Sequence, residues 1–177
     1  AIRFAKHIEP YDPLWFEEPT PPDRPEEMAL VARGTSIPIA TGERLTTKYE
    51  FGRVLELRAA SILQMALGGI WEAKIIAGMA EVNYAQIAPH LYAGPIEAAA
   101  NIQYGTSLPN FLILESIETF GGFYTKLLKK PIRWEQGYVI PSTEPGLGVE
   151  LNEEVALAHP YTGDKLHLEM LNHPVNV

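Results

Sequence analysis

The sequence predicts an α/β fold in which five βα-like units form part of a TIM-type (β/α) barrel with a parallel sheet. Short apolar runs begin at Leu14, Ile37, Ser61, Gln86 and Phe111, so consecutive starts lie 23, 24, 25 and 25 residues apart. This spacing is about the length of one strand, one helix and two short loops. Equal repeats favour a closed barrel, and the chain lacks the GxGxxG turn typical of an open nucleotide-binding sheet.

The stretches between these apolar runs carry signals for helices. RPEEMALVARG ends on Gly34, a residue type that commonly follows the last turn of a helix. Thr47 stands three residues before Glu50, which is the spacing of a capping box. WEAKIIAGMAEVNYA has an apolar face, and Pro95 opens PIEAAANIQYGTS at a position that suits proline. The order of strand and helix therefore predicts successive βα units.

Composition narrows the classes of function. The 177 residues are 46% hydrophobic and 20% charged, which is typical of one soluble globular domain. The chain contains no long apolar run and no signal-peptide pattern, so we expect a cytoplasmic protein with no membrane partner. The absence of cysteine excludes disulfides and thiolate catalysis. The formal net charge of −8 argues against a nucleic-acid partner.

The residues after Lys130 have a different pattern. PIRWEQGYVIPSTEPGLGVELNEE alternates apolar and polar residues and then contains Pro145, Gly146 and Gly148. This pattern predicts hairpin-like strands with a turn near those three residues. We therefore divide the chain into residues 1–130, the barrel part, and residues 131–177, the closing strands and tail.

Ionisable residues end four of the five apolar runs. They are Glu17 and Glu18, Glu43, His90 and Glu115, whereas the remaining run ends on Ala66. In a parallel barrel these ends converge on one rim, where catalytic groups sit. One such residue alone could be a solvated loop residue or a helix cap, but four in register predict a site. Crowded carboxylates repel one another without a cation, and oxygen ligands suit Mg²⁺.

These segments together resemble a known family. WFEEP at 15–19, PIATGE at 38–43, SILQM followed by GGI, APH at 88–90 and PNFLILE at 109–115 are similar to the second half of the barrel in the enolase superfamily. Within it they resemble the mandelate racemase subgroup, most closely its galactonate dehydratase-like acid sugar dehydratases. The resemblance covers nearly the whole chain and implies that it is the C-terminal portion of such a barrel.

The resemblance implies a role for each carboxylate of the first strand ends. Glu17 and Glu43 would be two of the ligands of a Mg²⁺ ion. Glu18 and Arg44 would contact the substrate or support a residue that binds it. Because side chains alternate along a strand, only one of Glu17 and Glu18 should point into the rim.

The reaction implied is the dehydration of an acid sugar by a carbon–oxygen lyase (hydro-lyase). A base removes the proton α to the substrate carboxylate, Mg²⁺ stabilises the resulting enediolate, and an acid expels the β-hydroxyl as water. His90 matches that acid, and Glu115 matches the residue that hydrogen-bonds the substrate carboxylate or enediolate. Two alternatives stay open: a racemase, epimerase or cycloisomerase of the same superfamily, and a non-catalytic barrel relative.

Two departures from the family pattern carry expectations of their own. The family has an aspartate paired with the histidine where this chain has Ala66, which supports the non-catalytic alternative and leaves His90 without a carboxylate partner. The loop after Ala66 is also shorter. Either both changes are real and activity should be low, or the sequence skips part of the loop. We favour the second alternative and therefore expect a break or impossible geometry between Met65 and Gly69.

The other departure is the number of units, because a closed barrel has eight and this chain has five. We expect a further metal ligand, the base and a capping domain upstream of Ala1, with the C-terminal tail packed on that domain. Residues 1–177 alone should then be inactive, and the whole enzyme should be a homo-oligomer.

Overall fold

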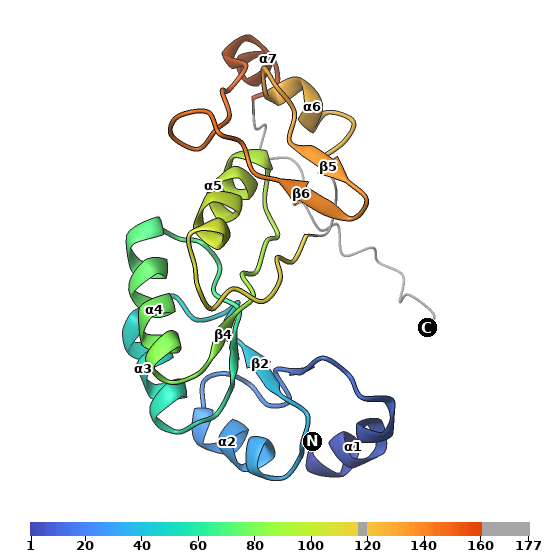
Figure 1. The fold of residues 1–177 in the computed structure, drawn as a ribbon, viewed down its shortest axis with the longest axis vertical. Helices are drawn as coiled ribbons and strands as arrows, with labels where there is room; N and C mark the ends of the chain where they lie inside the picture. Colours follow the sequence, from blue (N-terminus) through green and yellow to red (C-terminus); the bar gives the residue numbers. More distant parts are fainter. Residues whose placement is uncertain (117–119, 161–177) are drawn as a thin grey trace.

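The computed structural model of the chain describes residues 1–116 and 120–160. Helices α2 to α4 and the parallel sheet lie toward one end of the molecule, and a hairpin with two short helices lies at the other (Figure 1). Helix α5 stands between these two parts (Figure 1). Residues 161–177 of the predicted tail lie outside the described residues.

Four short strands form a parallel sheet in the order β1–β2–β3–β4. Their bounds are Phe16–Glu17, Ile39–Thr41, Ile62–Leu63 and Gln86–Ile87. Neighbours in the sheet are neighbours in the sequence, which is the order that successive βα units of a barrel produce. The predicted α/β architecture of a partial barrel is therefore confirmed.

The fifth apolar run contributes less than a full strand. Phe111 forms one parallel bridge with Ile87. The Ile87 amide donates to the Asn110 carbonyl at 2.9 Å, and the Leu112 amide donates to the Ile87 carbonyl at 2.8 Å. The run therefore lies beside β4 in the predicted parallel direction, but its pairing extends over a single residue pair.

The sequence signals for the helices are confirmed. The helical elements before residue 110 are α1 (Ile2–Ile8), the 3₁₀ helix η1 (Glu9–Tyr11), α2 (Pro25–Arg33), α3 (Lys48–Glu56), α4 (Ile70–Val82) and α5 (Pro95–Thr106). Gly34 is the C-cap of α2, and α5 begins at Pro95. Thr47 and Glu50 form both hydrogen bonds of the predicted capping box at the start of α3.

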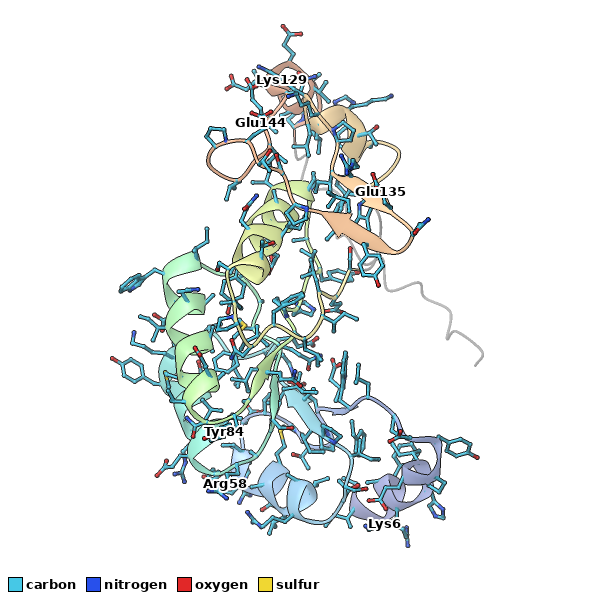
Figure 2. The ribbon with its side chains drawn as sticks, viewed as in Figure 1. Lys6, Arg58, Tyr84, Lys129, Glu135 and Glu144 are labelled. Carbon is cyan, nitrogen blue, oxygen red and sulfur yellow. The ribbon has the colours of Figure 1, made fainter. Side chains whose placement is uncertain are left out.

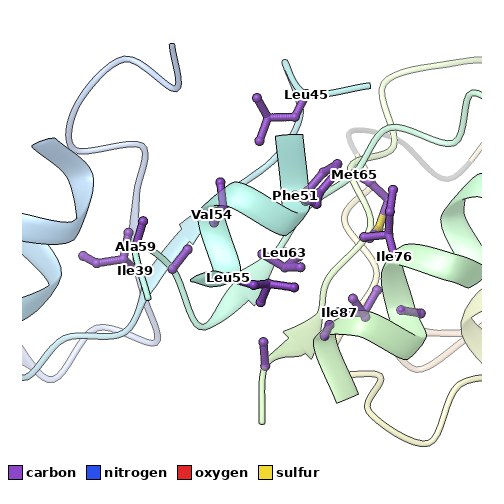
Figure 3. Packing of buried hydrophobic residues seen from close by; sticks show 14 of the residues in the cluster. Ile39, Leu45, Phe51, Val54, Leu55, Ala59, Leu63, Met65, Ile76 and Ile87 are labelled. Carbon is purple, nitrogen blue, oxygen red and sulfur yellow. The ribbon is translucent and has the colours of Figure 1, made fainter. Parts of the chain in front are cut away.

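The two faces of the sheet pack against different groups. Ile39, Leu63 and Ile87 lie in the main core with side chains of α3 and α4, among them Phe51 and Ile76 (Figure 3). A separate cluster contains Ala40, Ile62 and Ala88, with Trp15 and Leu112 packed against it. Because successive residues of a strand point to opposite faces, this second cluster marks the interior side of the partial barrel.

The C-terminal part contains an antiparallel hairpin. Strands β5 (Arg133–Glu135) and β6 (Tyr138–Ile140) lie between α6 (Tyr124–Leu127) and α7 (Glu153–Ala158). The predicted hairpin is present, and a turn that the sequence did not predict joins its two strands. Its turn consists of Gln136 and Gly137, with φ angles of 50° and 84° that match the twist of the strands. The chain turns again where the Gly148 amide donates to the Pro145 carbonyl.

The short loop after β3 is not strained, so the expected impossible geometry is wrong. The Gly68 amide donates to the Ala66 carbonyl at 2.9 Å, and α4 begins directly after Gly69. No residue from Met65 to Gly69 has a left-handed backbone. A tight turn that leads straight into the helix removes the need for a longer loop.

Candidate active site

Glu17 lies on the interior side of the partial barrel. Its Oε2 atom accepts hydrogen bonds from the Trp15 indole at 3.0 Å and from the Gln64 amide at 2.9 Å. Trp15 packs against the interior cluster, which places this carboxylate at the strand ends above that cluster. Within residues 1–116 and 120–160, Oε1 of Glu17 accepts no hydrogen bond that we identify. One oxygen of an exposed carboxylate is therefore held while the other is available.

Glu18 is directed away from Glu17. Its φ angle is 36°, and its carboxylate accepts hydrogen bonds from the Thr41 hydroxyl at 3.1 Å and from Arg44 Nε at 2.9 Å. Thr41 is fully buried. The hydrogen bond and charge of Glu18 raise the pKa of Arg44. The adjacent carboxylates thus have separate partners, as strand alternation predicts.

His90 connects the remaining predicted site residues. Its Nε2 atom lies 3.4 Å from Glu43 Oε2 and 3.8 Å from Glu115 Oε2. The Leu91 amide donates to Glu115 Oε2 at 3.2 Å, which helps to fix that carboxylate. The structure therefore brings Glu43, His90 and Glu115 together around one ring nitrogen.

Ala66 is the direct neighbour of His90 on the adjoining strand, because the two residues form a parallel bridge. Its methyl group offers the imidazole no hydrogen-bond acceptor. His90 therefore lacks the aspartate partner at this position, while Glu43 and Glu115 approach its Nε2 atom from other strand ends. The family's pairing is absent, and a different pairing occupies the same rim.

Two further residues of this site, Trp15 and Gln64, were not predicted from the sequence. Gln64 is the polar residue of an otherwise apolar run, and only 5% of its surface is exposed. Trp15 stands two residues before Glu17, on the same face of the chain. These two signals, a polar residue inside a buried strand and a donor at i−2, could have identified both.

The carboxylates of the rim could contribute to a magnesium site. Glu17 and Glu43 are exposed; Glu17 ends β1, and Glu43 follows the neighbouring strand β2. In the part of the chain that the structure describes, no group of three or more His, Cys, Asp or Glu side chains could hold a metal. Mg²⁺ is often bound through one or two carboxylates with water and substrate oxygens. The donor types therefore fit Mg²⁺, with this chain supplying part of the ligand set.

Two larger cavities lie away from this rim. One of about 650 Å³ opens where the strands begin and is lined by Ser61, Arg58 and Tyr84, the last two labelled near the α2–α4 end in Figure 2. The other, of about 470 Å³, lies between α5 and the segment after the hairpin. Neither is lined by the five ionisable residues of the strand ends, and catalytic groups of parallel barrels sit at the opposite end from the first cavity.

The described helices are also too short or too polar to cross a membrane. This holds for residues 1–116 and 120–160.

Comparison with known proteins places this geometry in a family. Residues 1–155 match the family described as enolase C-terminal domain-like. A D-galactonate dehydratase from Cronobacter sakazakii is 40% identical over 164 residues, which are 86% of this chain and 42% of that protein. A D-xylonate dehydratase from Haloferax volcanii is 32% identical over 169 residues, 94% of this chain and 41% of that protein.

A solved structure gives the same result. A mandelate racemase/muconate lactonizing enzyme from Sulfitobacter sp. has a TM-score of 0.87 and 58% identity, and the match covers 98% of this chain and 44% of that one. This chain thus spans about two fifths of the length of the curated relatives that it matches.

Proposed function

The chain belongs to the enolase C-terminal domain-like family, and from this membership we propose that it is part of a Mg²⁺-dependent acid sugar dehydratase. The curated relatives named as D-galactonate and D-xylonate dehydratases support this class of reaction. The observation that carries the proposal is the position of His90, whose Nε2 lies between Glu43 and Glu115 at the ends of the parallel strands. An acid sugar is the proposed substrate.

Glu17 and Glu43 are the proposed ligands for Mg²⁺. When bound, Mg²⁺ stabilises the negative charge that develops on the substrate carboxylate. The hydrogen bonds from Trp15 and Gln64 hold Glu17 in a single orientation. Glu43 can exchange its contact with His90 for a cation, because its side chain is 39% exposed.

His90 is the proposed general acid. Its Nε2 atom faces the two carboxylates, so this nitrogen would carry the proton that passes to the β-hydroxyl of the substrate. The carbon–oxygen bond breaks as that proton arrives, and the hydroxyl leaves as water. The α-proton is removed by a separate base, for which we assign no residue of this chain.

Glu115 is the proposed partner of the substrate carboxylate. The Leu91 amide holds Oε2, and the side chain is 42% exposed toward the rim. Two carboxylates can share a hydrogen bond only if one of them carries a proton, so this contact requires a proton on one of the two partners. Glu18 and Arg44, which bind each other, would support the substrate from the outer side of the rim.

A racemase or cycloisomerase is the second candidate, and one observation favours it. The solved mandelate racemase/muconate lactonizing enzyme from Sulfitobacter sp. is 58% identical, whereas the D-galactonate dehydratase is 40% identical. In a racemase the proton returns to carbon and no carbon–oxygen bond breaks. Formation of a 2-oxo acid from an acid sugar separates the two reactions.

His90→Asn in the full-length protein tests the proposed function. We expect the rate of 2-oxo acid formation from D-galactonate or D-xylonate to fall by about 10²–10⁴-fold, because the proton donor is lost. Mg²⁺ affinity should stay near the parent value, since the imidazole acts on the substrate. His7→Asn, which changes an exposed histidine of α1, is the matched control. Retained turnover in His90→Asn would contradict the acid role.

A further inference from the structure

We infer that Gln64 is a positioning residue that orients Glu17 for cation binding, an inference that rests on the proposed function. Gln64 directly follows β3, and 5% of its surface is exposed. A buried amide is costly unless it forms hydrogen bonds. Its Nε2 donates to Glu17 Oε2 at 2.9 Å, so its hydrogen-bonding capacity is directed at this carboxylate.

The backbone holds Gln64 at this place. The backbone N–H of Gln64 donates to the Thr41 carbonyl at 2.8 Å. This bond continues the pairing of Thr41 with Leu63 and sets Gln64 beside Gly42. On the other side of β2, Glu17 is paired with Ala40. Glu17 and Gln64 therefore lie on strands that flank β2.

The residues of β2 and its end leave room for this contact. Ala40 and Gly42 have little or no side chain, so the Gln64 amide can reach across β2 to Glu17. A Cβ atom on Gly42 would lie 2.9 Å from backbone atoms of Gln64 and 2.8 Å from the Phe51 ring. The close approach of these strands thus depends on glycine.

A second donor acts on the same oxygen. The Trp15 indole donates to Glu17 Oε2 at 3.0 Å, so two N–H groups, one from two residues earlier and one from the end of β3, donate to one atom. Neutral donors fix the rotamer of a carboxylate without neutralising its charge. Oε1 is then the oxygen presented to a cation, and Glu17 would bind it through that single oxygen.

Calorimetric titration of the full-length protein with Mg²⁺ tests this inference. Gln64→Met keeps the size of the side chain and removes the donor, and we expect Mg²⁺ affinity to fall by about 10–100-fold. Trp15→Phe removes the other donor and should weaken binding in the same direction. The matched control is Gln103→Met. Gln103 lies on α5, and its side-chain amide also donates to an acceptor distant in sequence, the Ser142 carbonyl.

A structural role alone would give a different result. Thermal unfolding without Mg²⁺ would then shift for Gln64→Met while Mg²⁺ affinity stayed at the parent value, and this result would overturn the inference. The electron paramagnetic resonance spectrum of bound Mn²⁺ should also change in Gln64→Met and stay unchanged in Gln103→Met, because only the former alters the ligand. If Gln64→Met does not fold, Trp15→Phe carries the same test.

The failure of the proposed function would look different again. If Glu17→Gln binds Mg²⁺ as tightly as the parent, Glu17 is not a ligand, and both the assignment and the inference are overturned. If Glu17→Gln loses binding while Gln64→Met and Trp15→Phe keep it, the ligand assignment stands and the positioning role alone is overturned.

Discussion

The two halves of the rim differ in how firmly their side chains are held. In one half, Glu17 and Glu18 accept hydrogen bonds of 2.5–3.1 Å from four side chains: Trp15, Gln64, Thr41 and Arg44. At the other half, the contacts of His90 with Glu43 and Glu115 are longer, at 3.4 and 3.8 Å. The first half is built to present a fixed carboxylate, and the second leaves groups free to exchange partners during a reaction.

Backbone packing also differs between two places near the rim, the end of β2 and the loop after β3. A Cβ atom on Gly42, next to Gln64, would meet backbone atoms at 2.9 Å, and the φ angle of Gly42 is 143°. A Cβ atom on Gly68, in the loop after Ala66, would meet no atom within 4 Å. The end of β2 is close-packed, whereas the loop after β3 has open space around Gly68.

Substitution of these two glycines by alanine sharpens the comparison. We expect it to change stability more than the Glu72 substitution described below. Gly42→Ala should lower the free energy of unfolding by about 1–3 kcal/mol, because the new side chain clashes and the backbone angle is unfavourable. Gly68→Ala should change it little or raise it by about 0.4–1 kcal/mol, because the site has room and the unfolded chain loses freedom. Denaturant unfolding of the full-length variants measures both.

Equal losses of stability in Gly42→Ala and Gly68→Ala would show that the end of β2 and the loop after β3 are packed alike. The comparison would then have to rest on the hydrogen bonds alone.

Much of this arrangement could be predicted from the sequence. The repeat of apolar runs predicted the strand order, and Thr47 with Glu50 predicted the start of α3, because these signals are local. The contact between Glu17 and Gln64 joins residues 47 positions apart, and it depends on strand stagger and on Gly42. A pattern in one segment does not contain that information.

The partners of His90 show the same limit. Ala66 indicated that His90 lacks the aspartate of the family, but the sequence did not show that Glu43 and Glu115 approach the same ring nitrogen. The short loop after Ala66 was expected to be strained, but a turn closed by the Gly68 amide avoids strain. In both cases the outcome depends on contacts made in the folded chain, which a comparison of sequence patterns does not show.

The start of α4, after the loop that contains Gly68, gives a smaller, pH-dependent test of how this part of the chain is held. Glu72 accepts hydrogen bonds from the Lys48 backbone amide at 2.8 Å and from Lys48 Nζ, and these contacts lower the pKa of Glu72 below 4.5. A lowered folded-state pKa contributes stability above pH 4.5, which is lost as the pH falls through the folded-state value. Glu72→Gln should therefore reduce the loss of stability below pH 4.5.

Denaturant midpoints of parent and Glu72→Gln between pH 6 and pH 3 measure this effect. Glu81→Gln, at an exposed position of the same helix, is the control. Parallel pH profiles for the parent and Glu72→Gln would mean that the Glu72–Lys48 contact does not anchor this helix.

The central claim is that the firmly held Glu17 binds the cation and that His90 acts on the substrate. Calorimetric Mg²⁺ titration of the full-length parent, Glu17→Gln and His90→Asn tests it most directly. Loss of a residue that only supports a ligand typically weakens metal binding by about 10–100-fold. The account predicts a larger loss of Mg²⁺ affinity for Glu17→Gln. His90→Asn should bind Mg²⁺ like the parent. Parent-like binding in Glu17→Gln, or lost binding in His90→Asn, would contradict it.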